Sequence, residues 1–159
     1  MKKRLKPMIE GKTYSLLQRL EAITRFLPIF ETPGFRFGES RGLEQLKHGV
    51  LESPLFVLSE EAVAFVRTCY DYGWIVEFEW GKWTGTREAI ILRDNPTALG
   101  QSTPEQLEKL LTVCVRQDRY CDGALAGAFD CGFLTAILQR AVVLRDELAT
   151  TEARKGSKD

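Results

Sequence analysis

The sequence predicts a mainly α-helical protein, a compact bundle of about five helices with a small β element. Apolar residues recur at three- and four-residue steps over several long stretches, which is the spacing of amphipathic helices. The clearest helix start is Thr103 to Gln106, with a capping threonine, a proline at the first helical position and a glutamine three residues after the cap. Gly123 and Gly132 then interrupt the second half. We therefore assign residues 13–148 to a single helical domain.

The first predicted helix runs from Thr13, its expected N-cap, to Phe30. Residues 1–12 carry five basic side chains, and we expect them to form a mobile basic arm. The segment from Glu31 to Pro54 is punctuated by glycine and proline and predicts a long loop. Within it Phe35 to Phe37 is expected to form a short strand that pairs with Leu55 to Leu58. A connection of this length is itself a candidate binding surface.

A second helix is predicted over Glu60 to Tyr72, capped by Ser59 and ended by Gly73. The alternation of residues from Trp74 to Trp80 predicts another short strand, so the β element is expected from the 35–58 and 74–80 segments.

The remaining helices follow the same reasoning. A short one is expected over Arg87 to Arg93, and a longer one continues from Pro104 to Arg119. The last helix is predicted over Phe133 to Leu148, and residues 149–159, which lack apolar anchors, are expected to form a disordered tail.

Composition narrows the functional classes. Lysine plus arginine (22) equals aspartate plus glutamate (22), so the chain lacks the overall positive field that draws proteins onto nucleic acid. The four cysteines include no Cys-x-x-Cys pair and His48 is the single histidine, so we predict no metal site, no cofactor and inert buried thiols, Cys121 among them. No apolar run reaches the length of a membrane span. We expect a soluble, cytoplasmic protein without membrane attachment.

Polar and aromatic residues gather around the junction that follows the long helix. Arg116, Arg119, Tyr120 and Gly123 fall on adjoining positions of one helical period. Two guanidiniums there could clamp a phosphate or carboxylate, and tryptophans three residues apart could stack a planar ring. The alternative is structural: Asp118, Asp122 or Glu79 pairs with the arginines, and the tryptophans belong to the core. The candidate binding residues are Trp80, Trp83, Arg116, Asp118, Arg119, Tyr120, Asp122 and Gly123.

Three stretches resemble a bacterial family known as domain of unknown function 6508. They are Phe78 to Trp83, Leu110 to Ala126 and Gly132 to Arg140. The family shows a Phe-Asp-Trp-x-x-Trp element, then Leu-Thr-x-x-x-Arg-x-Asp-Arg-Phe-Cys-x-Gly, then a leucine helix that starts with glycine. The resemblance covers roughly residues 78–140.

This resemblance implies no activity, cofactor or substrate. Glu79 stands where the family usually has aspartate, Tyr120 where it has phenylalanine, and Ala124 where histidine is common. The last departure removes the most plausible acid–base group, so an enzyme is disfavoured and we assign no catalytic residue.

Three functions stay open. The leading hypothesis is a non-catalytic interaction or regulatory module that binds a macromolecular partner, most simply a protein, through the arginines and tryptophans. The alternative is a small enzyme or ligand sensor for an anionic or nucleotide-like molecule. The third is nucleic-acid binding through the basic arm and the aromatics.

The last helix also predicts self-association. Leu134, Ile137, Ala141, Leu144 and Leu148 repeat in alternating three- and four-residue steps, the spacing of a seam between two helices. The seam could instead pack inside its own domain. Because it continues towards the end of the chain, where few partners remain, we expect a homodimer through the last helix.

Overall fold

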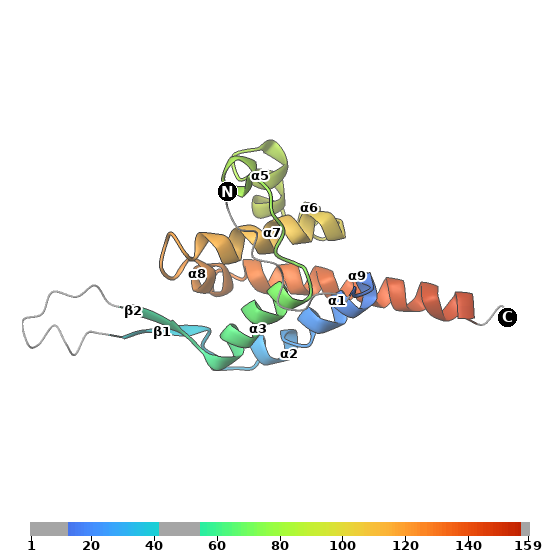
Figure 1. Ribbon diagram of the computed structural model, residues 1–159, viewed down its shortest axis with the longest axis horizontal. Helices are drawn as coiled ribbons and strands as arrows, with labels where there is room; N and C mark the ends of the chain where they lie inside the picture. The colour runs from blue at the N-terminus through green and yellow to red at the C-terminus, as the bar shows by residue number, and fades with distance from the viewer. Residues whose placement is uncertain (1–12, 42–54, 157–159) are drawn as a thin grey trace, which may run out of the picture.

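The computed structural model describes residues 13–41 and 55–156, and in this part of the chain it is mainly α-helical with one two-stranded sheet (Figure 1). The predicted fold class is confirmed. The elements, in chain order, are α1 (Leu16–Thr24), α2 (Leu27–Phe30), β1 (Gly38–Arg41), β2 (Leu55–Leu58), α3 (Glu60–Asp71), α4 (Trp80–Trp83), α5 (Arg87–Asp94), α6 (Pro96–Leu99), α7 (Pro104–Gln117), α8 (Ala124–Asp130) and α9 (Phe133–Gly156). The predictions for residues 1–12, and for most of the 31–54 loop, lie outside the described residues.

The predicted first helix is two helices, α1 and α2. Pro28 is the reason for the break, because proline lacks an N–H and its ring collides with the carbonyl four residues earlier in a continuous helix. The cap of α1 is Ser15 and not Thr13: its hydroxyl accepts the N–H of Gln18 while the Gln18 side chain accepts the N–H of Ser15. The predicted start at Thr13 and the continuity of the helix were therefore wrong, whereas the predicted end at Phe30 is the end of α2.

The hairpin pairs β1 with β2 in antiparallel register, from Gly38 opposite Leu58 to Arg41 opposite Leu55. The strand at 55–58 is confirmed, but its partner begins one residue after Phe37. The Phe37 ring is buried and stacks on Phe129 of α8 with centroids 5.1 Å apart. Because the Phe37 ring is packed in the core, strand pairing begins only after it, at Gly38. Figure 1 shows β1 and β2 leading away from the helical body.

The predicted strand at 74–80 is not formed. Trp74 is fully buried, and the backbone N–H of Val76 donates to the hydroxyl of Thr112 on α7 (3.0 Å). The same hydroxyl donates to the carbonyl of Glu108 at 2.7 Å. A helix side chain, and not a neighbouring strand, satisfies this backbone, so the segment is an irregular connection that lies against α7.

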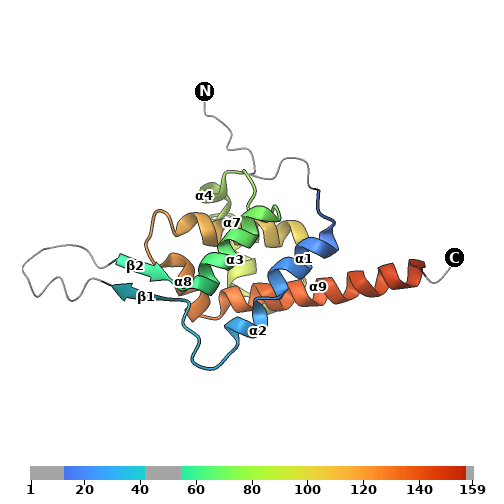
Figure 2. The ribbon, with the colours of Figure 1, turned by 60° about the horizontal axis from the view of Figure 1, so that its bottom comes forward.

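The core lies where α1, α3, α7 and α9 meet, and Figure 2 shows α9 running beside α1 and then beyond the body. Several aliphatic side chains from these helices are completely buried, among them Leu20, Leu107, Leu111, Leu134, Ile137 and Leu138. Burial of each such side chain stabilises the fold by about 1.5–3 kcal/mol. Three positions of the predicted seam, Leu134, Ile137 and Ala141, are thus filled by the chain's own core.

Helix α9 ends at Gly156, later than the predicted end at Leu148. Nothing between these residues breaks a helix, and the hydroxyls of Thr150 and Thr151 donate to the carbonyls of Asp146 and Glu147, one turn back. Arg154 and Lys155 lie in the last turn, where the negative end of the helix dipole favours cations. Residues 149–156 are accordingly helical and not a structureless tail.

No single helix in the described ranges is both long and apolar enough to cross a membrane; α8 and α9 pass that test only when taken together, across a 70° bend.

Candidate functional site

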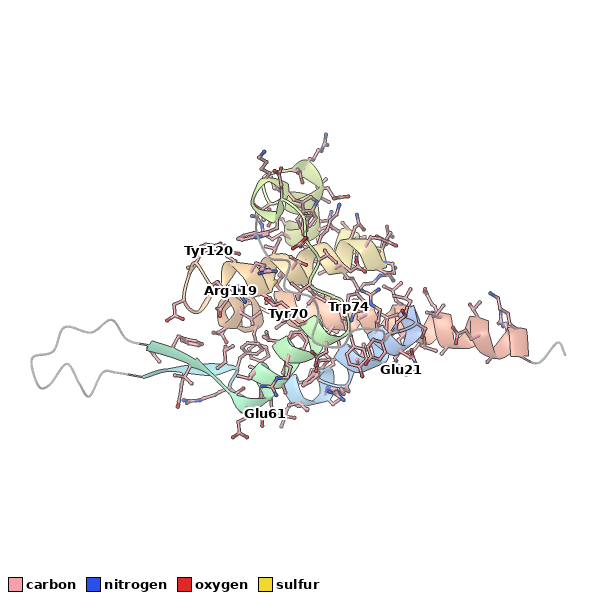
Figure 3. The ribbon with its side chains drawn as sticks, in the orientation of Figure 1. Glu21, Glu61, Tyr70, Trp74, Arg119 and Tyr120 are labelled. Atoms are coloured by element: carbon pink, nitrogen blue, oxygen red, sulfur yellow. The ribbon has the colours of Figure 1, made fainter. Side chains whose placement is uncertain are left out.

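A shallow hollow of about 190 Å³ lies where α4, the end of α7 and the 74–79 connection meet. Four of the predicted site residues line it together. The complete lining is Val76, Glu77, Phe78, Trp80, Arg116, Arg119 and Tyr120. We call the four predicted residues, Trp80, Arg116, Arg119 and Tyr120, the Arg–aromatic surface. Figure 3 shows Arg119 and Tyr120 at the end of α7, away from Glu21 on α1.

The two sides of the hollow are held in place by different local structures. On one side, the Thr112 hydroxyl fixes the 74–76 backbone and so places the residues that follow against α7. On the other, a tight turn follows the end of α7, where the N–H of Arg119 donates to the carbonyl of Arg116 (3.2 Å) and that of Tyr120 to the carbonyl of Gln117 (3.0 Å). This tight turn brings Arg116, Arg119 and Tyr120 to the same end of the helix.

Neither arginine of the hollow pairs with a carboxylate among the residues that the structure describes. Arg116 is half-buried and its guanidinium lies 5.8 Å from the centre of the Tyr70 ring, while Arg119 is exposed. Glu79, one proposed partner, pairs instead with Lys82 at 3.2 Å. The hollow thus offers two guanidiniums whose donors are open to a ligand, and each suits bidentate binding of a carboxylate or phosphate.

The aromatic half of the surface is a pair of rings. The Trp80 and Tyr120 centroids lie 5.9 Å apart with the planes tilted by 40°. Tyr120 is 82% exposed and lies beside the half-buried Trp80. The two rings leave no parallel slot between them, so together they form an open apolar face beside the arginines.

Asp118 and Asp122 have a different role from the arginines. Asp118 accepts the N–H of Leu125 at the start of α8 (3.0 Å), and Asp122 accepts the N–H of Phe56 in β2 (3.1 Å). Both carboxylates therefore bind backbone groups of the same chain. The structural alternative, in which these two aspartates pair with the arginines, is not found in the described part of the chain.

Gly123 also serves the attachment of the hairpin. Its φ is +87°, a conformation that favours glycine, and it lets α8 begin directly after the turn. A Cβ at Gly123 would lie 3.8 Å from the Phe56 ring, and one at Gly38 would lie only 2.5 Å from it. Phe56 thus packs between the two glycines and next to Asp122, which docks the hairpin at the turn that carries Tyr120.

Trp83 is the predicted site residue that the structure places in the core. It is only 9% exposed, and its indole N–H donates to Glu88 at 2.7 Å. Glu88 also accepts from Gln106 and lies 3.7 Å from the Lys109 ammonium. This network attaches α4 and α5 to α7, so Trp83 supports the hollow without facing it.

Three residues of the hollow were not predicted from the sequence, namely Val76, Glu77 and Phe78, and Glu77 is the charged one. Its side chain is exposed, and it has no ion pair or hydrogen bond within the described residues. The Glu77-Phe78-Glu79 run holds two carboxylates, and no local signal separates Glu77 from Glu79. Its position next to two guanidiniums became visible only with the fold.

The thiols divide into two classes. Cys69 and Cys114 are buried, and burial raises the pKa of the Cys114 thiol to about 12 and that of Cys69 further, so both stay protonated. Cys121 and Cys131 are exposed, so the expectation of a buried Cys121 was wrong. Cys121 lies in the turn after α7, where Tyr120 and Asp122 are exposed as well. Within the described ranges no group of three or more histidine, cysteine or acidic residues could hold a metal ion.

The comparisons with known proteins agree with the motifs at the hollow. A model for a family of unknown function, DUF6508, matches residues 15–147, which is most of the chain and includes α1 to α3 as well as the motifs between Phe78 and Arg140. No curated protein and no solved structure matches. From the extent of the family match, the chain belongs to the family of unknown function DUF6508.

Proposed function

We propose that this protein is a non-catalytic binding module that engages a partner protein through the Arg–aromatic surface. One observation carries the proposal: Arg116 and Arg119 have no carboxylate partner among the described residues and lie beside a tyrosine that is 82% exposed. Arginine, tryptophan and tyrosine are the residues that most often dominate the binding energy of protein interfaces. Their gathering on one surface is the composition expected of an interface centre.

The dimensions of the hollow favour a partner surface over a small molecule. Small-molecule sites usually enclose about 300–1,000 Å³, whereas this hollow measures about 190 Å³ and is open to solvent. Of the side chains that usually carry nucleophilic or acid–base catalysis, its lining offers Glu77 and Tyr120 but no histidine, cysteine, serine, threonine or lysine to activate them. These features support binding without chemistry.

A pull-down from the cytoplasmic fraction of the native cells tests this proposal; four free thiols support that compartment. Three baits are compared: the wild-type protein, the double variant Arg116→Ala with Arg119→Ala, and a control double variant, Arg67→Ala with Arg87→Ala. The control pair is exposed on α3 and α5, outside the hollow, and removes the same charge. We expect specific partners with the wild type and the control, and their loss with the first pair. An unchanged set of partners on a folded double variant would contradict the proposal.

The alternative function, a sensor for a small anionic or nucleotide-like ligand, gives a different result in a thermal-shift screen. A ligand that binds only the folded state at 100 times its dissociation constant adds about 2.7 kcal/mol of stability. We expect no such gain from small anions, because the open hollow encloses little of them. A large gain that disappears in the Arg116→Ala with Arg119→Ala variant would favour the sensor.

A further inference from the structure

We infer that the partner presents an acidic polypeptide segment to the hollow, with a side-chain carboxylate bound by Arg116 and Arg119 and a neighbouring N–H bound by Glu77. The inference rests on the proposed function and specifies the chemistry of the partner. It begins from the charged groups that line the hollow. Within the described residues, the cations Arg116 and Arg119 and the anion Glu77 form no ion pair there.

The arginines require a negative group on the partner. A guanidinium donates in a fixed fork that matches the two oxygens of a carboxylate, and such charge-assisted bonds are about twice as strong as neutral ones. Arg116 is held by its contact with the Tyr70 ring, so part of the cost of ordering its side chain is already met.

Glu77 determines which negative group fits. An ionised carboxylate only accepts hydrogen bonds, so Glu77 needs a donor on the partner. A nucleic-acid strand carries a phosphate on every nucleotide, and a phosphate on the arginines would bring its neighbours towards Glu77, where like charges repel. A polypeptide offers the complementary arrangement, because every peptide bond beside an acidic residue supplies an N–H. The net charge of zero also gives no general attraction for nucleic acid.

The aromatic rings determine what flanks the acidic residue. Trp80 and Tyr120 present an apolar face next to the arginines, and burying it requires an apolar side chain on the partner. The segment that fits is therefore an acidic residue with large apolar neighbours. Glu77 is a specificity-determining residue in this arrangement.

Titration of the ¹⁵N-labelled full chain, followed by two-dimensional NMR, tests the inference. The probes are a short, terminally blocked Gly/Ser peptide with a central Leu-Glu-Leu, the same peptide with Leu-Gln-Leu, and single-stranded oligothymidine. We expect the acidic peptide to shift the Trp80 indole N–H and the Arg119 amide, with an affinity about tenfold above that of the Gln peptide. Arg116→Gln with Arg119→Gln should abolish this preference, whereas Arg67→Gln with Arg87→Gln should leave it intact.

The role of Glu77 has its own readout. Glu77→Gln keeps the shape of the side chain and an acceptor oxygen but removes the charge. It should strengthen the binding of oligothymidine and so narrow the preference for the acidic peptide over oligothymidine. Equal affinity of the two peptides, tighter binding of oligothymidine to the wild type, or no shift at the hollow with any probe would each overturn the inference. If the peptide titration fails but the pull-down partners still depend on Arg116 and Arg119, only the acidic-peptide inference is wrong. If those partners do not depend on the two arginines, the proposed function is wrong as well.

Discussion

The carboxylate of Asp122 accepts a hydrogen bond of 3.1 Å from the backbone N–H of Phe56, 66 residues away along the chain. The contact joins the β-hairpin to the turn that carries Tyr120, and the Phe56 ring completes it by packing between Gly38 and Gly123. The Arg–aromatic surface and the hairpin are thus attached to the same turn, so loosening one should disturb the other.

Asp122→Ala tests this attachment. We expect the free energy of unfolding to fall by about 1 kcal/mol, because a hydrogen bond to a charged acceptor is lost at an exposed position. Amide exchange should quicken at Val57 and Leu58. The matched control is Asp130→Ala, which removes an exposed carboxylate that has no partner within the described residues. Equal effects of the two variants on urea unfolding would show that the Phe56 contact adds nothing.

The Trp83–Glu88 contact predicts a pH dependence. Hydrogen bonds from Trp83, first, and from Gln106 hold the pKa of the Glu88 carboxyl below its ordinary value of 4.5. The unfolded state therefore takes up this proton at a higher pH than the folded state does. The stabilisation is complete above the ordinary pKa and is lost as the pH falls from 4.5 through the lower pKa of the folded state.

Urea unfolding at a series of pH values from neutral to strongly acid measures this loss. Trp83→Phe keeps most of the packing but removes the indole donor, so its stability should fall less steeply with acid than that of the wild type. Glu88→Gln should remove this part of the slope altogether. Glu147→Gln is the control, an exposed carboxylate on α9. If all the variants follow the wild-type slope below pH 4.5, Glu88 is not perturbed by this network.

The homodimer through α9 stays a prediction. The fully buried Leu134, Ile137 and Ala141 leave Leu144 and Leu148 as the half-buried seam positions for a second copy. Light scattering should give about twice the 18.0 kDa mass of the chain. Leu148→Glu, at the last half-buried position of the seam, should restore the monomer with unchanged helical content. A monomeric wild type would assign the whole seam to the chain's own core.

Local signals account for the parts of the fold that the sequence predicted. The capping box of Thr103 and Gln106 is present with bonds of 2.9 and 3.2 Å, and Gly73 ends α3 with a positive φ, as expected. Each of these features depends on residues within one turn of each other. That is also why Arg116, Arg119 and Tyr120 could be grouped correctly before the fold was known.

Long-range contacts determine the features that were not predicted from the sequence. The alternation from Trp74 to Trp80 resembles a strand, but Thr112 takes the N–H of Val76 from a helix 36 residues further on. Trp80 and Trp83 have the same local signal, yet only Trp83 has Glu88 beside it to satisfy the indole within the core. No pattern within either segment encodes these partners, so the arginines of the hollow could be named from the sequence but Glu77, which lines the same hollow, could not.

Photo-crosslinking from position 120 tests most directly whether the Arg–aromatic surface binds a partner protein. Tyr120 is replaced by a benzophenone amino acid, which suits an 82% exposed ring, and the protein is irradiated in its native cells. We predict a discrete crosslinked protein that is lost when Arg116→Ala and Arg119→Ala are added. The same photoreactive residue at position 67, exposed on α3, should not give that product. Identical products from both positions, or a product at position 120 that persists without the arginines, would contradict the proposed role of the Arg–aromatic surface.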